Sequence, residues 1–133
     1  MGLLSLLLDT HCWLWFHWNA DRLPSPLKRT LRRASTSLYL STVSLVEISI
    51  KHASAKLRLP VAPAEFVTEL LRESVQILPV QAEHALRLGA LPLHHRDPFD
   101  RLLVAQAQVE GFTLVTADPQ ILQYDVKTID ARK

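Results

Sequence analysis

The chain contains few of the residues that mark several common classes of protein. Its 133 residues include one cysteine and three glycines. The single cysteine, Cys12, rules out an internal disulfide and indicates a reducing compartment. With three glycines and no P-loop, the sequence lacks the glycine-rich phosphate cradle of nucleotide kinases and dinucleotide enzymes. These two classes of enzyme are therefore not expected.

The sequence also lacks a long hydrophobic run. The apolar segment 3–8 is much shorter than the roughly 20 residues that a membrane-spanning helix needs, and Asp9 ends it. The first residues, Met-Gly-Leu-Leu-Ser, have neither the basic region nor the small-residue cleavage site of a signal peptide. We therefore expect a cytoplasmic protein that makes no use of a membrane.

Neither sign of charge is in large excess. The 15 Lys and Arg and 13 Asp and Glu give a net charge of +2, which is too small to indicate a nucleic-acid partner. Basic residues are nevertheless concentrated in the short stretch 22–33. The candidates for contact with a nucleic-acid backbone are Lys28, Arg29, Arg32 and Arg33 in this stretch and Arg96 in a later loop. A solvated helix face and a solvated loop are the alternative interpretations.

Apolar segments and helical patterns alternate along the chain. Strands are expected at 3–8, 38–40, 75–80, 112–116 and 126–129. Helices are expected from Pro24 onward, at 43–56, at 64–74, at 81–91 and at 100–110, where Gly111 takes the C-terminal capping position. The alternation predicts an α/β fold, a parallel sheet with helices on both faces, in a single domain over residues 1–133.

Four acidic residues lie where these elements begin or end. Asp9 follows the first strand, and Asp118 lies two residues beyond the fourth. Glu47 is in the first turns of the helix after the second strand, and Asp100 opens the helix before the fourth. Ligands of parallel α/β sheets bind at the carboxyl ends of the strands, so we expect the four to converge. Carboxylates beside a hydrophobic core need compensation, and Mg²⁺ or Mn²⁺ prefers such oxygen ligands. The pattern therefore predicts a metal site suited to phosphodiester hydrolysis.

Each acid also has a purely structural interpretation. Asp9 and Asp118 could cap a helix or a turn. Glu47 lies three residues after a serine, as in a capping box. Asp97 and Asp100 could both favour the positive end of a helix dipole. The four acids become informative only jointly.

The remaining reactive side chains carry less weight. His11 is expected beside the acids, where it orients a water or a phosphate. His94 and His95 adjoin each other without the spacing of a helical zinc pair, and we expect them in a solvated loop. Cys12 is interpreted as a small buried side chain and not as a nucleophile. The aromatic residues of segment 13–18 are expected to pack a short helix against the core.

Four segments resemble the PIN-domain ribonucleases, and most closely the VapC-type toxins of bacterial toxin–antitoxin pairs. They are Leu-Leu-Leu-Asp9-Thr-His, Ser41-Thr-Val-Ser-Leu-Val-Glu47-Ile-Ser-Ile-Lys, Asp97-Pro-Phe-Asp100-Arg-Leu-Leu-Val-Ala-Gln-Ala and Leu114-Val-Thr116-Ala-Asp118. The resemblance runs over essentially the whole chain, in order and at the spacing of the family. It implies a three-layer α/β/α sandwich with a five-stranded parallel sheet, and an endoribonuclease that requires Mg²⁺ or Mn²⁺.

The resemblance also assigns roles and partners. The catalytic and metal-binding quartet would be Asp9, Glu47, Asp100 and Asp118. Thr116 would support the site, Asp97 would be a nearby acid, and Arg101 would pair with neighbouring acids. The expected partners are an RNA substrate, a second copy of the chain, and an antitoxin whose C-terminal segment occupies the active-site groove.

The expected function is therefore a metal-dependent endoribonuclease, the toxin of such a pair, which hydrolyses RNA with a metal-activated water. A catalytically silent RNA-binding or interaction module on the same fold is one alternative. A haloacid-dehalogenase-type phosphatase is another, although its chemistry calls for a second aspartate where this chain has His11.

Overall fold

The computed structural model describes residues 3–133. It contains one sheet, whose strands are β1 (Leu4–Leu8), β2 (Thr36–Ser41), β3 (Gln76–Leu78), β4 (Thr113–Thr116) and β5 (Thr128–Asp130). The strand order is β3-β2-β1-β4-β5, and every neighbouring pair is parallel. The predicted α/β fold with a five-stranded parallel sheet is confirmed.

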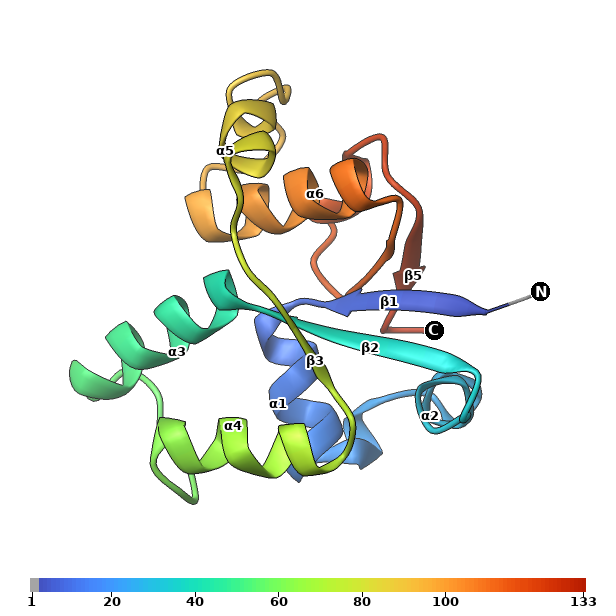
Figure 1. The fold of residues 1–133 in the computed structure, drawn as a ribbon, viewed down its shortest axis with the longest axis vertical. Coiled ribbons are helices and arrows are strands. Elements are labelled where there is room, and N and C mark those ends of the chain that lie inside the picture. Colours follow the sequence, from blue (N-terminus) through green and yellow to red (C-terminus); the bar gives the residue numbers. More distant parts are fainter. Residues whose placement is uncertain (1–2) are drawn as a thin grey trace.

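Within residues 3–133, six helices connect and cover the strands. They are α1 (Thr10–Trp18), α2 (Ser25–Leu31), α3 (Thr42–Ala53), α4 (Pro63–Arg72), α5 (Ala82–Leu88) and α6 (Pro98–Glu110), with short 3-10 turns η1 (Ala20–Arg22) and η2 (Ile121–Gln123). Figure 1 shows α5 and α6 on one side of the sheet and α1, α2 and α4 on the other, which makes three layers. In residues 3–133 no helix has both the length and the apolar character to cross a bilayer.

The alternation of side chains in β1 joins these layers. Leu6 and Leu8 are buried with residues of α1, α2 and α4, whereas Leu7 is buried with residues of α6. Successive side chains of a strand point to opposite faces of its sheet, so a continuous apolar run is what a strand covered on both sides requires. The expected aromatic helix is α1, with Trp13 fully buried in the core below the sheet.

Helix boundaries differ from the sequence expectation in two places that affect the site. Helix α3 begins after Ser41, whose hydroxyl accepts from the backbone N–H of Val43 at 3.0 Å, so the alternative interpretation of Glu47 as part of a capping box is wrong. Helix α6 begins at Pro98 with Asp97 as its N-cap, so Asp100 does not open this helix. A proline fits the first turn because it needs no hydrogen bond for its missing N–H. At the other end Gly111 caps α6 with a left-handed φ of 72°, as predicted.

The candidate active site

The carboxyl end of β1 positions Asp9 at the centre of the sheet edge. Its side chain is 5% exposed, and its Oδ1 accepts from the backbone N–H of Cys12 at 2.9 Å as the N-cap of α1. Its Oδ2 accepts from the hydroxyl of Thr116, at the end of β4, at 2.6 Å. Burial raises the pKa of Asp9, and the hydrogen bond from Thr116 opposes that rise. Asp9 therefore both caps a helix and presents a carboxylate at the sheet edge.

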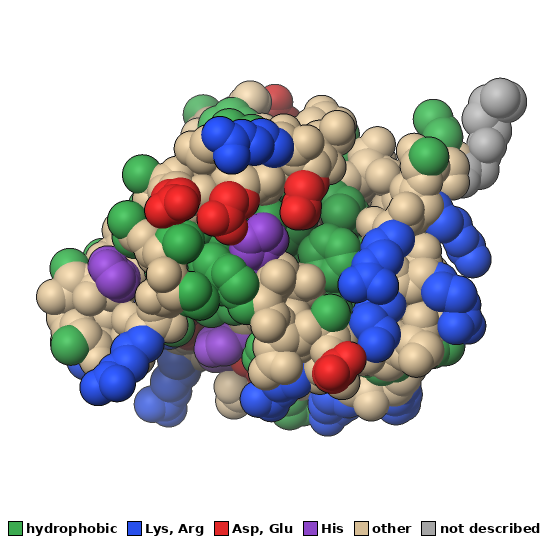
Figure 2. All heavy atoms as spheres, turned by 90° about the horizontal axis from the view of Figure 1, so that it is seen from below, with side chains coloured by type: hydrophobic (Ala, Val, Ile, Leu, Met, Phe, Trp, Pro, Cys, Tyr) green, Lys and Arg blue, Asp and Glu red, His purple; other side chains and the backbone are tan. Residues whose placement is uncertain are grey.

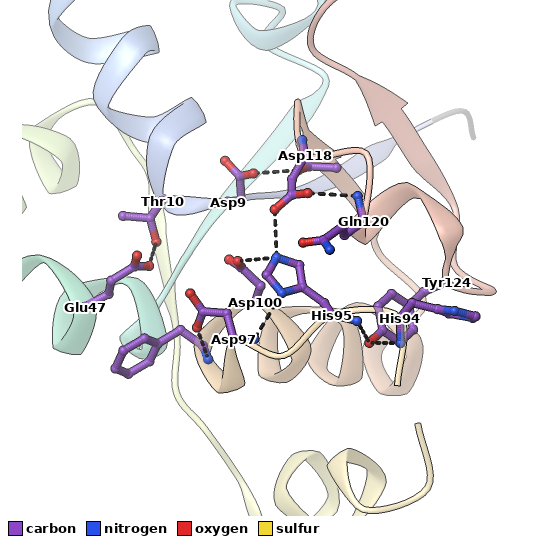
Figure 3. Close-up of polar contacts among 12 residues, drawn as sticks. Asp9, Thr10, Glu47, His94, His95, Asp97, Asp100, Asp118, Gln120 and Tyr124 are labelled. Carbon is purple, nitrogen blue, oxygen red and sulfur yellow. Dashed lines mark hydrogen bonds and ion pairs between the residues drawn. The ribbon is translucent and has the colours of Figure 1, made fainter. Parts of the chain in front are cut away.

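Helix α3 places Glu47 on the opposite wall. Glu47 is 3% exposed, and its Oε1 accepts from the hydroxyl of Thr10 at 2.7 Å. Its Oε2 accepts from the ammonium of Lys51, one helical turn later, at 2.5 Å. Figure 3 shows the bond between Thr10 and Glu47. Sequence analysis missed both partners, although the i,i+4 spacing of Glu47 and Lys51 was a usable signal.

Two aspartates at the start of α6 have different roles. Asp97 is the N-cap, and its Oδ1 accepts from the backbone N–H of Phe99 at 2.8 Å. Asp100, three residues after Asp97, has no such capping bond. Its Oδ2 lies 3.0 Å from the imidazole Nε2 of His95. Both aspartates line the same pocket. Of the two, only Asp100 makes no capping bond, so it is the better candidate for a metal ligand.

His95 links Asp100 to Asp118 and is the principal residue that sequence analysis missed. Its Nε2 lies 2.8 Å from Oδ2 of Asp118 as well as 3.0 Å from Asp100 (Figure 3). The other oxygen of Asp118, Oδ1, accepts from the backbone N–H of Gln120 at 2.8 Å. The expected solvated loop is therefore wrong for His95, whose side chain is 11% exposed, and right for His94, which is exposed. The sequence feature that could have placed His95 near the site is its position two residues before Asp97.

The four predicted acids surround one pocket of about 230 Å³. It is lined by Asp9, His11, Trp15, Glu47, Lys51, Asp97, Asp100, Ala117 and Asp118. Burial raises the pKa of Asp100 to about 7, and the charges of Asp97, Glu47 and Asp9 act in the same direction. His95 opposes this shift. The pocket thus holds more negative charge than its own cations neutralise.

This donor set fits a divalent cation. Clustered carboxylates raise one another's pKa until a cation compensates them. The raised pKa of Asp100 has this cause in part. Mg²⁺ and Mn²⁺ favour carboxylate oxygens, and Mg²⁺ usually takes one or two of them. Asp9, Asp100 and Asp118, with Glu47 across the pocket, are the residues that would hold it.

Two other predicted neighbours occupy different positions. The expected pairing of Arg101 with acids is wrong: its guanidinium donates to the backbone carbonyls of Leu88 and Leu91, at 3.4 and 3.2 Å. It thereby ties α6 to the chain after α5. His11 is exposed on the rim of the pocket, with its ring 6.2 Å from that of Trp15.

The basic stretch lies apart from the acids. The backbone carbonyl of Arg33 accepts from Thr36 at the amino end of β2, whereas the pocket lies at the carboxyl ends of the strands. Lys28, Arg29 and Arg32 come from α2 and the residue after it, and none lines the pocket. Figure 2 shows Lys and Arg side chains gathered on the side of the molecule where α2 lies. Arg96, between His95 and Asp97, is exposed close to the pocket.

Cys12 has no nucleophilic role in this geometry. It is fully buried, and burial together with the charge of Asp9 raises the pKa of its thiol. A neutral buried thiol is a packing residue. The interpretation of Cys12 as a small core side chain agrees with this position.

Loss of the hydrogen bond from Thr116 to Asp9 should weaken metal binding. Thr116→Val keeps the shape of this fully buried side chain but removes the hydroxyl that orients Oδ2 of Asp9. We expect Mn²⁺ affinity to fall about 10- to 100-fold, as for other groups that orient metal ligands. Titration calorimetry measures this affinity. Thr116→Ser, which keeps the hydroxyl, should bind nearly as well as the wild type, and an equal loss in both variants would contradict the role of the hydroxyl.

The topology and the acidic pocket define an α/β protein with a carboxylate site at the carboxyl edge of its sheet. The family model of the PIN domain matches residues 6–127. The chain therefore belongs to the PIN domain family. No curated protein shows significant similarity to the sequence.

Solved structures of low identity share the fold. VapBC2 from Rickettsia felis, bound to a DNA fragment from its promoter, is similar with a TM-score of 0.73 at 14% identity, over 96% of this chain and 98% of that one. VapBC-1 from nontypeable Haemophilus influenzae gives 0.67 at 20% identity, over 98% and 100%. VapBC-5 from Mycobacterium tuberculosis, described as a member of a family of toxin–antitoxin systems, gives 0.62 at 17% identity, over 97% and 98%. At these identities the likeness concerns the fold.

Proposed function

We propose that this protein is an endoribonuclease that depends on Mg²⁺ or Mn²⁺ and uses the acidic pocket to hydrolyse RNA. The observation that carries the proposal is the convergence of Asp9, Glu47, Asp100 and Asp118, from four separate segments, on one pocket whose negative charge is only partly compensated. Such a pocket is costly to a fold unless a cation compensates it. Membership of the PIN domain family supports the assignment to a nuclease.

The residues of the chain divide the work of the reaction. A bound metal would polarise the scissile phosphate and lower the pKa of a water that attacks it. Asp9 and Asp100 are the ligands that we assign first, with Asp118 beside them. Glu47, held by Thr10 and Lys51, either completes the ligand set or orders the attacking water. Lys51, 38% exposed at the pocket wall, is available to the negative charge of the substrate.

The direct test is cleavage of total bacterial RNA by the purified protein, with Mg²⁺, with Mn²⁺ and with EDTA. We expect discrete fragments with either metal and none with EDTA or with Asp9→Asn. A folded wild type that binds RNA but cuts none under either metal would identify a silent binding module. Cleavage that survives EDTA would contradict the metal-dependent reaction.

The toxin role and its partner belong to the same proposal. One solved structure of this fold is described as a toxin–antitoxin complex from Klebsiella pneumoniae, and another as a member of a family of toxin–antitoxin systems. We propose that a cognate antitoxin restrains this nuclease and that its C-terminal segment occupies the acidic pocket. A second copy of the chain would cover the apolar pocket of about 300 Å³ lined by Thr42, Val43, Val46, Val80, Phe99 and Leu102, between α3 and α6. A cytoplasmic location fits an enzyme that acts on cellular RNA.

The proposed contacts of the basic residues with RNA can be separated by salt dependence. Each phosphate contact contributes about 0.7 to the slope of log affinity against log salt for a single strand. Arg96→Gln, beside the pocket, should lower the slope for RNA binding by about that amount. Arg33→Gln, at the amino end of β2, should lower it equally only if RNA extends to α2. Both are measured in an Asp9→Asn background, and an unchanged slope in both would remove these residues from the RNA interface.

A further inference from the structure

The imidazole of His95 has three polar contacts that together determine which of its ring nitrogens carries the proton. Nε2 faces Oδ2 of Asp118 at 2.8 Å and Oδ2 of Asp100 at 3.0 Å. On the other side of the ring, Nδ1 accepts from the backbone N–H of Asp97 at 3.0 Å. The grouping of one imidazole and two carboxylates has the dimensions of a three-ligand metal site. The question is whether His95 is one of the ligands.

The hydrogen bond from Asp97 answers it. A backbone N–H can only donate, so Nδ1 of His95 must carry the lone pair. A neutral imidazole has one protonated nitrogen, and here that nitrogen is Nε2. Nε2 therefore donates to the two aspartates and has no lone pair for a metal. His95 could become a ligand through Nε2 only by breaking the bond to Asp97.

The backbone around His95 is held in place by neighbouring elements. The hydroxyl of Tyr124 accepts from the backbone N–H of His95 at 3.0 Å and of His94 at 3.1 Å (Figure 3). The guanidinium of Arg101 holds the carbonyl of Leu91 a few residues earlier. These contacts make the position of the imidazole a property of the fold, so it is set before any cation arrives.

We propose that His95 is a positioning residue that holds the carboxylates of Asp100 and Asp118 together for the metal and is not itself a metal ligand. The proposal rests on the proposed function, in which these two carboxylates bind the cation. The shared Nε2–H offsets the repulsion between the two Oδ2 atoms. Because a carboxylate has several acceptor positions, the contact with His95 leaves both aspartates able to accept a cation. Groups that orient metal ligands in this way typically contribute about 10- to 100-fold in metal affinity.

The test compares Mn²⁺ binding by titration calorimetry in the wild type, His95→Gln, His95→Asn and the matched control His94→Asn. The amide nitrogen of glutamine reaches the place of Nε2, whereas that of asparagine falls short. We expect His95→Asn to lose about 10- to 100-fold in affinity. His95→Gln and the exposed His94→Asn should bind within a few-fold of the wild type, with all four folded by circular dichroism.

A second measurement reports directly on the atoms bonded to the metal. Pulsed electron paramagnetic resonance of Mn²⁺ bound to protein with isotope-labelled histidine reports a directly bonded nitrogen. We expect no such coupling from His95. A directly bonded imidazole whose signal persists in His11→Asn, which removes the histidine on the rim of the pocket, would overturn the proposal. Equal affinities in His95→Asn and the wild type would also overturn it while leaving the metal site intact. Absence of Mn²⁺ binding by the wild type would overturn the proposed function, and this inference with it.

Discussion

Asp100→Asn should lower the rate of RNA cleavage by about 100- to 1,000-fold without unfolding the protein. The metal supplies several kcal/mol of transition-state stabilisation, and each 1.36 kcal/mol or so is tenfold in rate. Asp100 faces the pocket with no capping bond of its own, so its replacement removes a negative ligand and leaves the helix start intact. Single-turnover cleavage of a labelled RNA at saturating Mn²⁺ measures the effect.

Asp97→Asn is the matched control, because it removes the same charge from the same pocket. Asparagine caps a helix about as well as aspartate, so the bond to the N–H of Phe99 can persist. We expect a loss of less than tenfold in this variant. An equal loss in both variants would show that the distinction drawn between the capping aspartate and the ligand is wrong.

The burial of Asp100 and the negative charges around it should also make the metal-free protein less stable as pH rises. The pKa of Asp100 is about 7 in the folded chain against an ordinary value of 3.8, so the folded state binds more protons between these values. The free energy of unfolding should therefore be highest below about pH 4, fall as pH rises towards 7 and level off above it. The raised pKa of Asp9 acts in the same direction. The loss is on the order of a few kcal/mol.

Asp100→Asn should remove the part of this pH dependence that Asp100 contributes. Thermal unfolding in EDTA should show a higher midpoint for the variant than for the wild type at pH 8, by about 3 °C for each kcal/mol regained. Excess Mn²⁺ should narrow or reverse the difference, because the wild type binds it more tightly. A wild-type midpoint that rises between pH 4 and 7, or a variant with the same slope, would contradict the account of the charge.

The residues that could be predicted are those whose position follows from the chain alone. Asp9 and Thr116 lie at or directly after strand ends, and a parallel sheet brings such ends to one edge whatever the loops do. Asp100 lies in the first turn of a long amphipathic helix, so its place near that edge also follows from local pattern. The fold could be predicted for the same reason, since strands and helices alternate along the chain with clear apolar patterns.

The residues that were missed or misplaced depend on how loops fold. His95 reaches the acids because Tyr124 and Arg101 hold the segment before α6, and none of these contacts has a local signature. Arg101 was expected beside acids from the resemblance to the PIN-domain ribonucleases. Its position in α6 instead directs it to the carbonyls of Leu88 and Leu91. Lys51 was overlooked because a charged residue on a helix is usually solvated, whereas here it pairs with a buried glutamate.

The most direct test of the metal-dependent nuclease follows Mn²⁺ occupancy and RNA cleavage in the same samples. Bound Mn²⁺ is measured by electron paramagnetic resonance across a titration, and the single-turnover rate is measured on each aliquot. We predict that the rate rises in proportion to occupancy of the site, and that Asp9→Asn loses both together. Cleavage that is already complete at zero occupancy, or full occupancy without cleavage of any RNA, would contradict the account.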